Sequence, residues 1–267
     1  MLTELKTQFE SIYQDCQAKT KNENDVQKFM EDNTELIPRV FLLNHGVNLD
    51  TAFVKVSIGG GSYKSDFMLI TKSTVEARCV HIEIENPVKK PFSANGEMTS
   101  DLSHAIGQVK SWQAELAIPS AQMILADDVK KTLPIHMRDL PISHKFVLVY
   151  GRRSDLIHDK KKLWKGFNDD NFSLMTFDSL FEDDSKKLHV GKFVQKKVKI
   201  EKMNGIFSQS VFASFLNPAD YMFKQSDVDL MIKKYEANRQ LKRDHMQEAM
   251  KDYDASVIAG LKSIETY

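Results

Sequence analysis

The sequence predicts a mixed α/β domain, in which helices flank a β-sheet, with an N-terminal helix before it and a helical appendage after it. Residues 52–58 and 77–85 alternate in polarity as strands do, and residues 100–117 repeat apolar side chains at helical spacing. Beyond residue 185 the composition changes to a lysine-rich stretch and then to a long charged segment. These observations divide the chain into an N-terminal helix at 1–22, a main domain at 23–184 and a C-terminal segment at 185–267.

The composition excludes several classes of protein. With 267 residues, 42% of them hydrophobic and 28% charged, the chain can bury a substantial core. Lys and Arg number 37, as do Asp and Glu, so any contact with nucleic acid must come from local patches. No apolar run approaches the roughly 20 residues that span a bilayer, and the first residues lack a basic-then-apolar signal. We therefore expect a cytoplasmic protein that does not contact a membrane.

The two cysteines carry no sign of metal or redox chemistry. Cys16 and Cys79 have neither a CxxC spacing nor a neighbouring Cys/His pattern, which argues against a zinc site and a disulfide framework. We interpret both as reduced, buried packing residues.

Two helices are expected before the sheet. The first should end near residue 19, because apolar side chains recur at three- and four-residue steps, namely Leu2, Leu5, Phe9, Ile12 and Cys16. Asn22–Asn24 interrupts this pattern, and Asp25 is the expected capping residue of the second helix. Pro38 marks the break that follows.

Three strands follow. Residues 52–58 and 63–71 are joined by Gly59–Gly61, which predicts a hairpin. In residues 77–85, apolar positions alternate with His81, Glu83 and Glu85. Since successive side chains of a strand point to opposite faces, both glutamates must lie on the same side of the sheet.

A helix is predicted next, from an N-cap at Ser100 to about Ala117. Its apolar stripe should lie against the sheet, and Gly107 should permit a close approach of the backbones. Further elements are expected as a buried strand at 145–151, a helix at 159–168, a strand at 172–177 and a short helix at 178–183.

Three carboxylates are expected to converge. Asp66 lies on the second strand, and Glu83 and Glu85 lie on one face of the third. Neighbouring anions repel and desolvation raises their pKa values, a cost that a divalent cation removes. Oxygen ligands favour Mg²⁺ or Mn²⁺, which can polarise a phosphodiester and activate water. The alternative is that these acids form the solvated face of an antiparallel sheet.

Gln108 and His104 lie one turn apart on the helix that follows the acidic strand. The Gln108 amide could orient an attacking water or a phosphate oxygen, or it could be an ordinary surface residue. We interpret His104 as a helix-surface or packing residue.

The segments that carry these residues resemble a known family. They are YKSDFMLI at 63–70, HIEIENP at 81–87 and AIGQVKSW at 105–112. In this order they resemble the D…ExK…Q pattern of the Shedu anti-phage defence nucleases, within the PD-(D/E)XK superfamily. Segments 23–37, 146–153 and 172–180 are similar to the opening helix and later strands of that family.

The resemblance implies a restriction-endonuclease-like PD-(D/E)XK sheet and a metal-dependent endonuclease that nicks or cleaves DNA, with Mg²⁺ or Mn²⁺ as cofactor. It implies that Asp66 and Glu83 hold the metal ion and that Glu85 is a third ligand or the group that activates water. Gln108 would complete the site, and Glu23 would supply a further acid. It also implies a homo-oligomer.

One position departs from the family pattern, because Glu85 stands where the family usually has lysine. A lysine would supply positive charge to the nucleophile and the phosphate, whereas a glutamate demands another metal ion or acts as a base. A degenerate nuclease that binds DNA or a protein partner without cleavage therefore remains an alternative.

Positive charge gathers after the main domain. Lysines concentrate in one stretch, at Lys186, Lys187, Lys192, Lys196, Lys197, Lys199 and Lys202. They could contact phosphates or protect the edge of a sheet from pairing. Arg152–Arg153 and Lys160–Lys162 are further candidates for phosphate contact.

One long charged helix is predicted from about Asp227 to Ile264. It carries an apolar seam at alternating four- and three-residue steps, at Met246, Met250, Tyr253, Val257, Leu261 and Ile264. The seam packs either on its own domain or against a second subunit.

Overall fold

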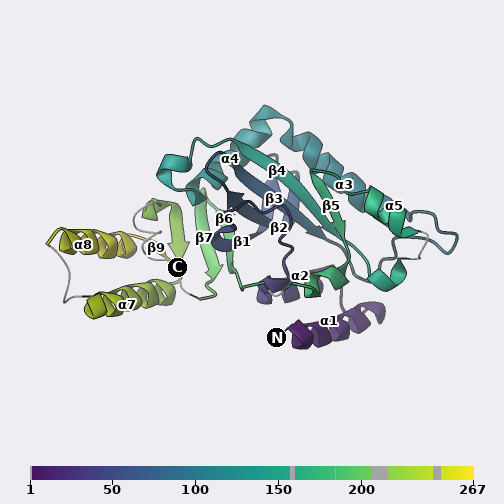
Figure 1. Cartoon of the computed structure of the whole chain (residues 1–267), viewed down its shortest axis with the longest axis horizontal. Coiled ribbons are helices and arrows are strands. Elements are labelled where there is room, and N and C mark those ends of the chain that lie inside the picture. The colour runs from purple at the N-terminus through teal and green to yellow at the C-terminus, as the bar shows by residue number, and fades with distance from the viewer. Residues whose placement is uncertain (1, 157–159, 184, 206–215, 243–247) are drawn as a thin grey trace.

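The computed structural model describes residues 2–156, 160–183, 185–205, 216–242 and 248–267, with the backbone alone at 238–242 and 248–254. Its strands are β1 (Val47–Ile58), β2 (Tyr63–Lys72), β3 (Ala77–Ile84), β4 (Ile142–Val149), β5 (Phe172–Met175), β6 (His189–Val194), β7 (Lys197–Lys202), β8 (Tyr221–Phe223) and β9 (Glu265–Thr266). They form one mixed sheet in the order β5-β4-β3-β2-β1-β6-β7-β8-β9 (Figure 1). The predicted mixed α/β sheet is confirmed.

Helices cover the sheet on both faces. The α-helices are α1 (Leu2–Gln17), α2 (Glu23–Asp32), α3 (Ser100–Leu116), α4 (Pro119–Thr132), α5 (Lys161–Gly166), α7 (Gln225–Lys242) and α8 (Glu248–Lys262). Short 3₁₀ helices are η1 (Thr34–Leu36), η2 (Ile135–Met137), η3 (Arg153–Asp155), η5 (Phe177–Phe181) and η6 (Pro218–Asp220). None of these described helices is long and apolar enough to cross a lipid bilayer.

The connections explain the direction of the strands. β1, β2 and β3 form an antiparallel meander, whereas β3, β4 and β5 run parallel. Parallel neighbours need a crossover, which α3 and α4 supply between β3 and β4. The sequence predicted α3 but not α4.

The register of β2 and β3 brings two acids together. Phe67 pairs with Ile82 across the antiparallel ladder, so Asp66 and Glu83 lie side by side at the start of one strand and the end of the other. Both faces of these strands are covered by apolar clusters, so a one-residue slip would turn their apolar side chains to the wrong faces.

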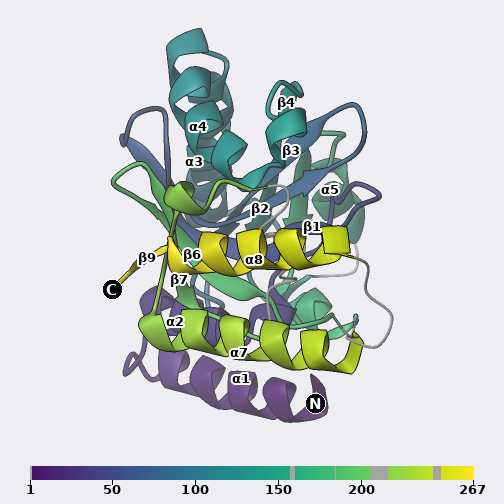
Figure 2. The ribbon, with the colours of Figure 1, turned by 90° about the vertical axis from the view of Figure 1, so that its left-hand side faces the viewer.

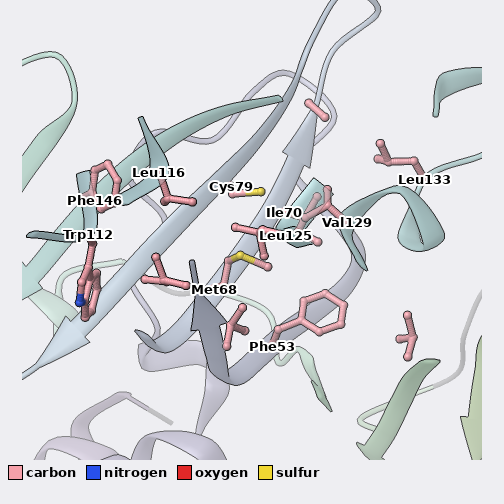
Figure 3. Packing of buried hydrophobic residues seen from close by; sticks show 14 of the residues in the cluster. Phe53, Met68, Ile70, Cys79, Trp112, Leu116, Leu125, Val129, Leu133 and Phe146 are labelled. Carbon is pink, nitrogen blue, oxygen red and sulfur yellow. The ribbon is translucent and has the colours of Figure 1, made fainter. Parts of the chain in front are cut away.

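The two faces of the sheet have separate cores. On one face, Val80, Ile82 and Ile84 pack with Phe9 of α1 and Val26 of α2. On the other face, the predicted stripe of α3 is buried, at Leu102, Ile106, Val109, Trp112 and Leu116. Figure 3 shows Trp112 and Leu116 beside sheet residues of this second core. Both cysteines are free and buried, as predicted.

The helix caps correct two predictions. Asn22 caps α2, since its side chain accepts a hydrogen bond from the Asn24 N–H at 2.9 Å. Asp25 instead accepts from the Asn22 N–H at 2.9 Å, which closes a capping box. Thr99 rather than Ser100 caps α3. The consequence for α2 is that Glu23 becomes its first residue, at the positive end of the helix dipole.

The prediction of one long C-terminal helix was wrong. The structure has two helices, α7 and α8, which lie side by side (Figure 2). Val228 of α7 and Val257 and Leu261 of α8 belong to the same buried cluster. A single helix would expose these apolar side chains, and two packed helices bury them.

The apolar seam of that segment packs within its own chain where it is described. Val257, Leu261 and Ile264 are buried in the core cluster. Met246 and the side chains of Met250 and Tyr253 lie outside the described residues.

The lysine-rich stretch forms a hairpin of β6 and β7 inside the sheet. β6 also pairs with β1, and β7 with β8, so neither strand is an edge and edge protection is not their role. Many of the lysines lie within ion-pair distance of carboxylates, as in Lys192–Glu201 at 2.8 Å and Lys202–Asp32 at 3.1 Å. Such pairing lowers the positive charge left for phosphate contact.

Candidate functional site

Four carboxylates meet where β2 begins and β3 ends. Asp66, Glu83 and Glu85 are 5%, 8% and 7% exposed, and the partly buried Glu23 reaches them from the first turn of α2. The pKa of Glu83 is raised by burial and then by the charges of Asp66, Glu23 and Glu85, so these four side chains form one electrostatic unit. We call them the acid centre.

Asp66 is fixed on both of its oxygens. Its Oδ1 accepts a hydrogen bond from Lys55 Nζ at 2.6 Å, and its Oδ2 accepts from the Ile84 N–H at 3.0 Å. The second bond ties Asp66 to the strand that carries Glu83 and Glu85. Two donors and a buried position leave this carboxylate little freedom to rotate.

Lys55 lies opposite Asp66 in the register of β1 and β2, and the backbone of β1 is irregular at this residue. Its φ is +50°, a left-handed conformation that is uncommon for a non-glycine residue. The normal alternation fails there, since Phe53 and Val56, three residues apart, pack in the same core cluster. Strain of this kind tends to mark functional sites. Nothing in the polarity pattern of 52–58 predicted it.

Glu83 has one engaged oxygen and one without a partner. Gln108 Nε2 donates to Glu83 Oε1, so the structure brings this residue of α3 into direct contact with the acid centre. Glu83 Oε2 is buried and, among the described residues, has no hydrogen-bond partner. Burial and the neighbouring anions hold the pKa of Glu83 far above its usual range, which favours a proton on this group.

Glu85 is paired with a lysine that the sequence patterns did not single out. Lys89 Nζ donates to Glu85 Oε2 from the loop after β3. Burial alone would lower the pKa of Lys89, but its hydrogen bond and attraction to Glu85 outweigh burial and raise it. The ammonium absent from position 85 is thus supplied four residues later.

Glu23 completes the acid centre from the opposite face of the sheet. Burial raises the pKa of Glu23 to about 7, with further contributions from the charges of Glu85 and Asp66. Its protonation therefore changes near neutral pH, where its neighbours Asp66 and Glu85 hold ion pairs with lysines.

The acid centre suits a divalent cation by its chemistry but is not assembled as a ligand shell. Across the described residues, no group of three or more His, Cys, Asp or Glu side chains is arranged so that it could hold a metal ion. Lys55 and Lys89 occupy oxygens of Asp66 and Glu85 instead. The all-oxygen donor set and the unpartnered Glu83 Oε2 nevertheless fit a hard cation such as Mg²⁺.

His104, Arg152 and Arg153 are not part of the acid centre. His104 is an exposed residue of α3, as interpreted from the sequence. Arg152 is not free for phosphate, because it pairs with Glu10 at 2.6 Å and with Asp178 at 2.9 Å and lies over the ring of Tyr13. Arg153 pairs with Glu182. Both arginines tie η3 to neighbouring elements.

Comparison with known proteins identifies one family. No curated protein matches the chain. The family model described as "Shedu protein SduA, C-terminal" matches residues 20–181, more than half of the chain. The match includes the whole acid centre and Gln108 and ends before β6. This chain therefore belongs to the Shedu family.

Proposed function

We propose that this protein is a metal-dependent DNA endonuclease of the PD-(D/E)XK type. Membership of the Shedu family suggests a role in anti-phage defence. The observation that carries the proposal is Glu83, a buried acid with an unpartnered oxygen among three other carboxylates. Acids forced together in this way are stabilised by a cation, and a cation beside a phosphodiester promotes its hydrolysis.

The ligands in this proposal are Asp66 and Glu83, with Glu85 as a third ligand or as the base. A bound Mg²⁺ or Mn²⁺ would neutralise the carboxylates, polarise the phosphodiester and lower the pKa of a water molecule. The protein supplies the positioning: the Ile84 N–H orients Asp66, and the Gln108 amide orients Glu83.

Two lysines and a further acid surround these groups. Lys55 and Lys89 balance part of the negative charge while no metal ion is bound. Glu23, with its pKa raised to about 7, can take up or release a proton next to Glu85.

The test is Mg²⁺-dependent nicking of a supercoiled plasmid. Asp66→Ala and Glu83→Ala should lower the nicking rate by at least about 100-fold, the upper end of what loss of even an outer-shell partner costs a metal site. Asp127→Ala, on an exposed position of α4, is the matched control and should nick at the wild-type rate. Circular dichroism checks that each variant folds. Nicking that persists without Asp66 or Glu83 rejects the site.

A second candidate function is supported by the lysine contacts. Since Lys55 and Lys89 already occupy oxygens of Asp66 and Glu85, the centre could be a degenerate site in a protein that binds DNA or a partner without cleavage. Calorimetric titration with Mn²⁺ separates the two, because binding of the ion by the endonuclease should give a saturable heat signal, either absorbed or released. Absence of both heat and nicking with either metal favours the silent module.

Glu85→Lys also distinguishes the endonuclease from the degenerate site. If Glu85 is a ligand or base, the change removes that role and places an ammonium beside Lys89, so nicking should fall at least tenfold, on the order of one lost coordinating interaction. Faster nicking by this variant would instead show that Glu85 had impaired a lysine-dependent site.

We also propose a homo-oligomer, which sedimentation analysis of the intact chain tests.

A further inference from the structure

An open groove lies beside the acid centre, between the start of β2 and α3. Its volume is about 810 Å³, within the range of ~300–1,000 Å³ common for ligand sites. Lys64 lies on one side, and Ser103, His104, Gly107 and Ser111 of α3 lie on the other. We call this hollow the α3 groove.

The α3 groove adjoins the acid centre at two points. Gln108 lines it and donates a hydrogen bond to Glu83. Lys64 lines it and precedes Asp66 by two residues on β2, so both side chains leave the same face of the strand. A chain lying in the groove would therefore pass beside the acid centre.

The lining suits a phosphate backbone rather than a cation or an apolar ligand. Hydroxyl groups from Ser100 and Ser103, the Lys64 ammonium and the Gln108 amide are all donors that bind phosphate and sugar oxygens in nucleic-acid complexes. None of the described lining residues is Asp or Glu. Lys64 is exposed, and within the described chain it forms no ion pair with a carboxylate.

Two further observations indicate space and an unused donor. A Cβ at Gly107 would meet no atom within 4 Å, so this glycine opens the groove and does not serve close backbone packing, contrary to the sequence prediction. Trp112, which lines the groove and is 0% exposed, has an indole N–H with no acceptor among the described residues. Buried donors are usually satisfied, so an unpartnered one needs an explanation.

We propose that the α3 groove binds the sugar-phosphate backbone of one DNA strand and guides a phosphodiester to the acid centre. This inference rests on the proposed function, because it takes the polyanion in the groove to be the DNA that the acid centre would cleave. Lys64 contacts a phosphate, the α3 hydroxyls contact the adjacent backbone, and the missing side chain at Gly107 makes room for the strand.

The experiment fills the groove and measures binding without catalysis. Binding of fluorescently labelled single-stranded and duplex oligonucleotides to the full chain is followed by anisotropy in EDTA. Gly107→Phe should weaken binding by on the order of tenfold or more, comparable to one lost base-stacking or phosphate interaction. Gly107→Ala should bind as the wild type, because it adds one methyl group to open space. Ser11→Phe, on an exposed position of α1 across the sheet from the groove, is the matched control.

Lys64→Ala tests the phosphate contact independently of any change in shape. The slope of log affinity against log salt concentration should decrease in magnitude by about 0.7–0.9, the value for one phosphate contact. Lys6→Ala, on an exposed position of α1, should leave affinity and slope unchanged. An unchanged slope for Lys64→Ala together with Gly107→Phe affinity within twofold of wild type overturns the proposal.

A small diester separates this inference from the proposed function. Bis(p-nitrophenyl) phosphate is too short to occupy the groove, so its hydrolysis by the wild type reports on the acid centre alone. If groove variants lose DNA binding but the wild type hydrolyses no diester, the groove stands and the endonuclease fails. If Gly107→Phe binds and nicks normally while Asp66→Ala does not nick, the groove fails and the endonuclease stands.

Discussion

Two buried polar clusters share one face of β3, and they differ in what would satisfy them. His81 Nε2 meets His144 Nδ1 of β4 at 3.1 Å, and burial lowers the pKa of both rings, that of His144 to about 4. Two residues further along, burial and neighbouring anions raise the pKa of Glu83. Both clusters favour neutral groups. One nitrogen of each imidazole meets the other ring, although His81 Nδ1 has no partner among the described residues, whereas the carboxylates need protons or cations.

The difference follows from position along the strand. His81 is fully buried in the middle of β3, against Phe146. The acids lie at the end of β3, where the N-terminus of α2 and two partly exposed lysines reach them. A polar cluster in the interior of a sheet is structural, while one at the end of a strand can exchange ions with its surroundings.

The largest expected difference between the clusters is their response to a divalent metal. Mg²⁺ or Mn²⁺ at about 100 times its dissociation constant should stabilise the fold by about 2.7 kcal/mol, which raises the melting temperature by roughly 5–10 °C in a chain of this size. Differential scanning fluorimetry at pH 8 measures the shift. Glu83→Ala should abolish it and His144→Asn should preserve it; equal shifts in all three proteins would contradict a metal site at the acid centre.

A somewhat smaller effect is expected from alkaline pH in the absence of metal. Because the folded-state pKa values of Glu83 and Glu23 are raised, the folded protein holds more protons than the unfolded chain above about pH 4.5, so stability falls as the pH rises. In EDTA the melting temperature should therefore decline from pH 5 to pH 8. Glu83→Gln should remove most of this decline and melt at a higher temperature than the wild type at pH 8, because the amide carries no charge to bury. A variant no more stable than wild type at pH 8 would show that Glu83 is not strained.

The smallest effect is expected from the histidine pair, and it has the opposite sign. A buried imidazole with a lowered pKa stays neutral in the fold while the unfolded chain takes up a proton below about pH 6.5, so stability falls on acidification. The ring resonances of His144 should titrate near pH 4 by NMR, and His144→Asn should melt with a shallower acid limb than wild type. Titration of His144 near pH 6.5 would mean that the pair is not buried as described.

Local sequence patterns predicted several features of β3 and α3 correctly. The alternation in 77–85 correctly put His81 and Glu83 on one face, opposite Ile82. The stripe of α3 correctly predicted which side of that helix meets the sheet, and hence that Gln108 could approach the acids. Periodicity succeeds here because the direction of a side chain in a strand or helix depends only on a few neighbouring residues. Both faces of the sheet also require apolar side chains, which makes the pattern visible in the sequence.

Features that depend on distant segments were missed. The left-handed backbone of Lys55, the pairing of Lys89 with Glu85 and the open space at Gly107 have no periodic signature. The cap of α2 was assigned to Asp25 although Asn22 provides it, since both residue types cap helices and their hydrogen bonds decide. The packing of α7 against α8 was not predicted, because no local pattern shows that Val228 and Leu261 share one core.

The sequence by itself determined the α/β class, the face on which the acids lie and, through ordered motifs, the Shedu family. Only the tertiary structure decided which cation meets which carboxylate, which oxygen of Glu83 is left without a partner, and where a strand of substrate could lie. The physical reason is that side-chain type and spacing fix local direction, whereas register, burial and charge pairing arise between segments far apart in the chain.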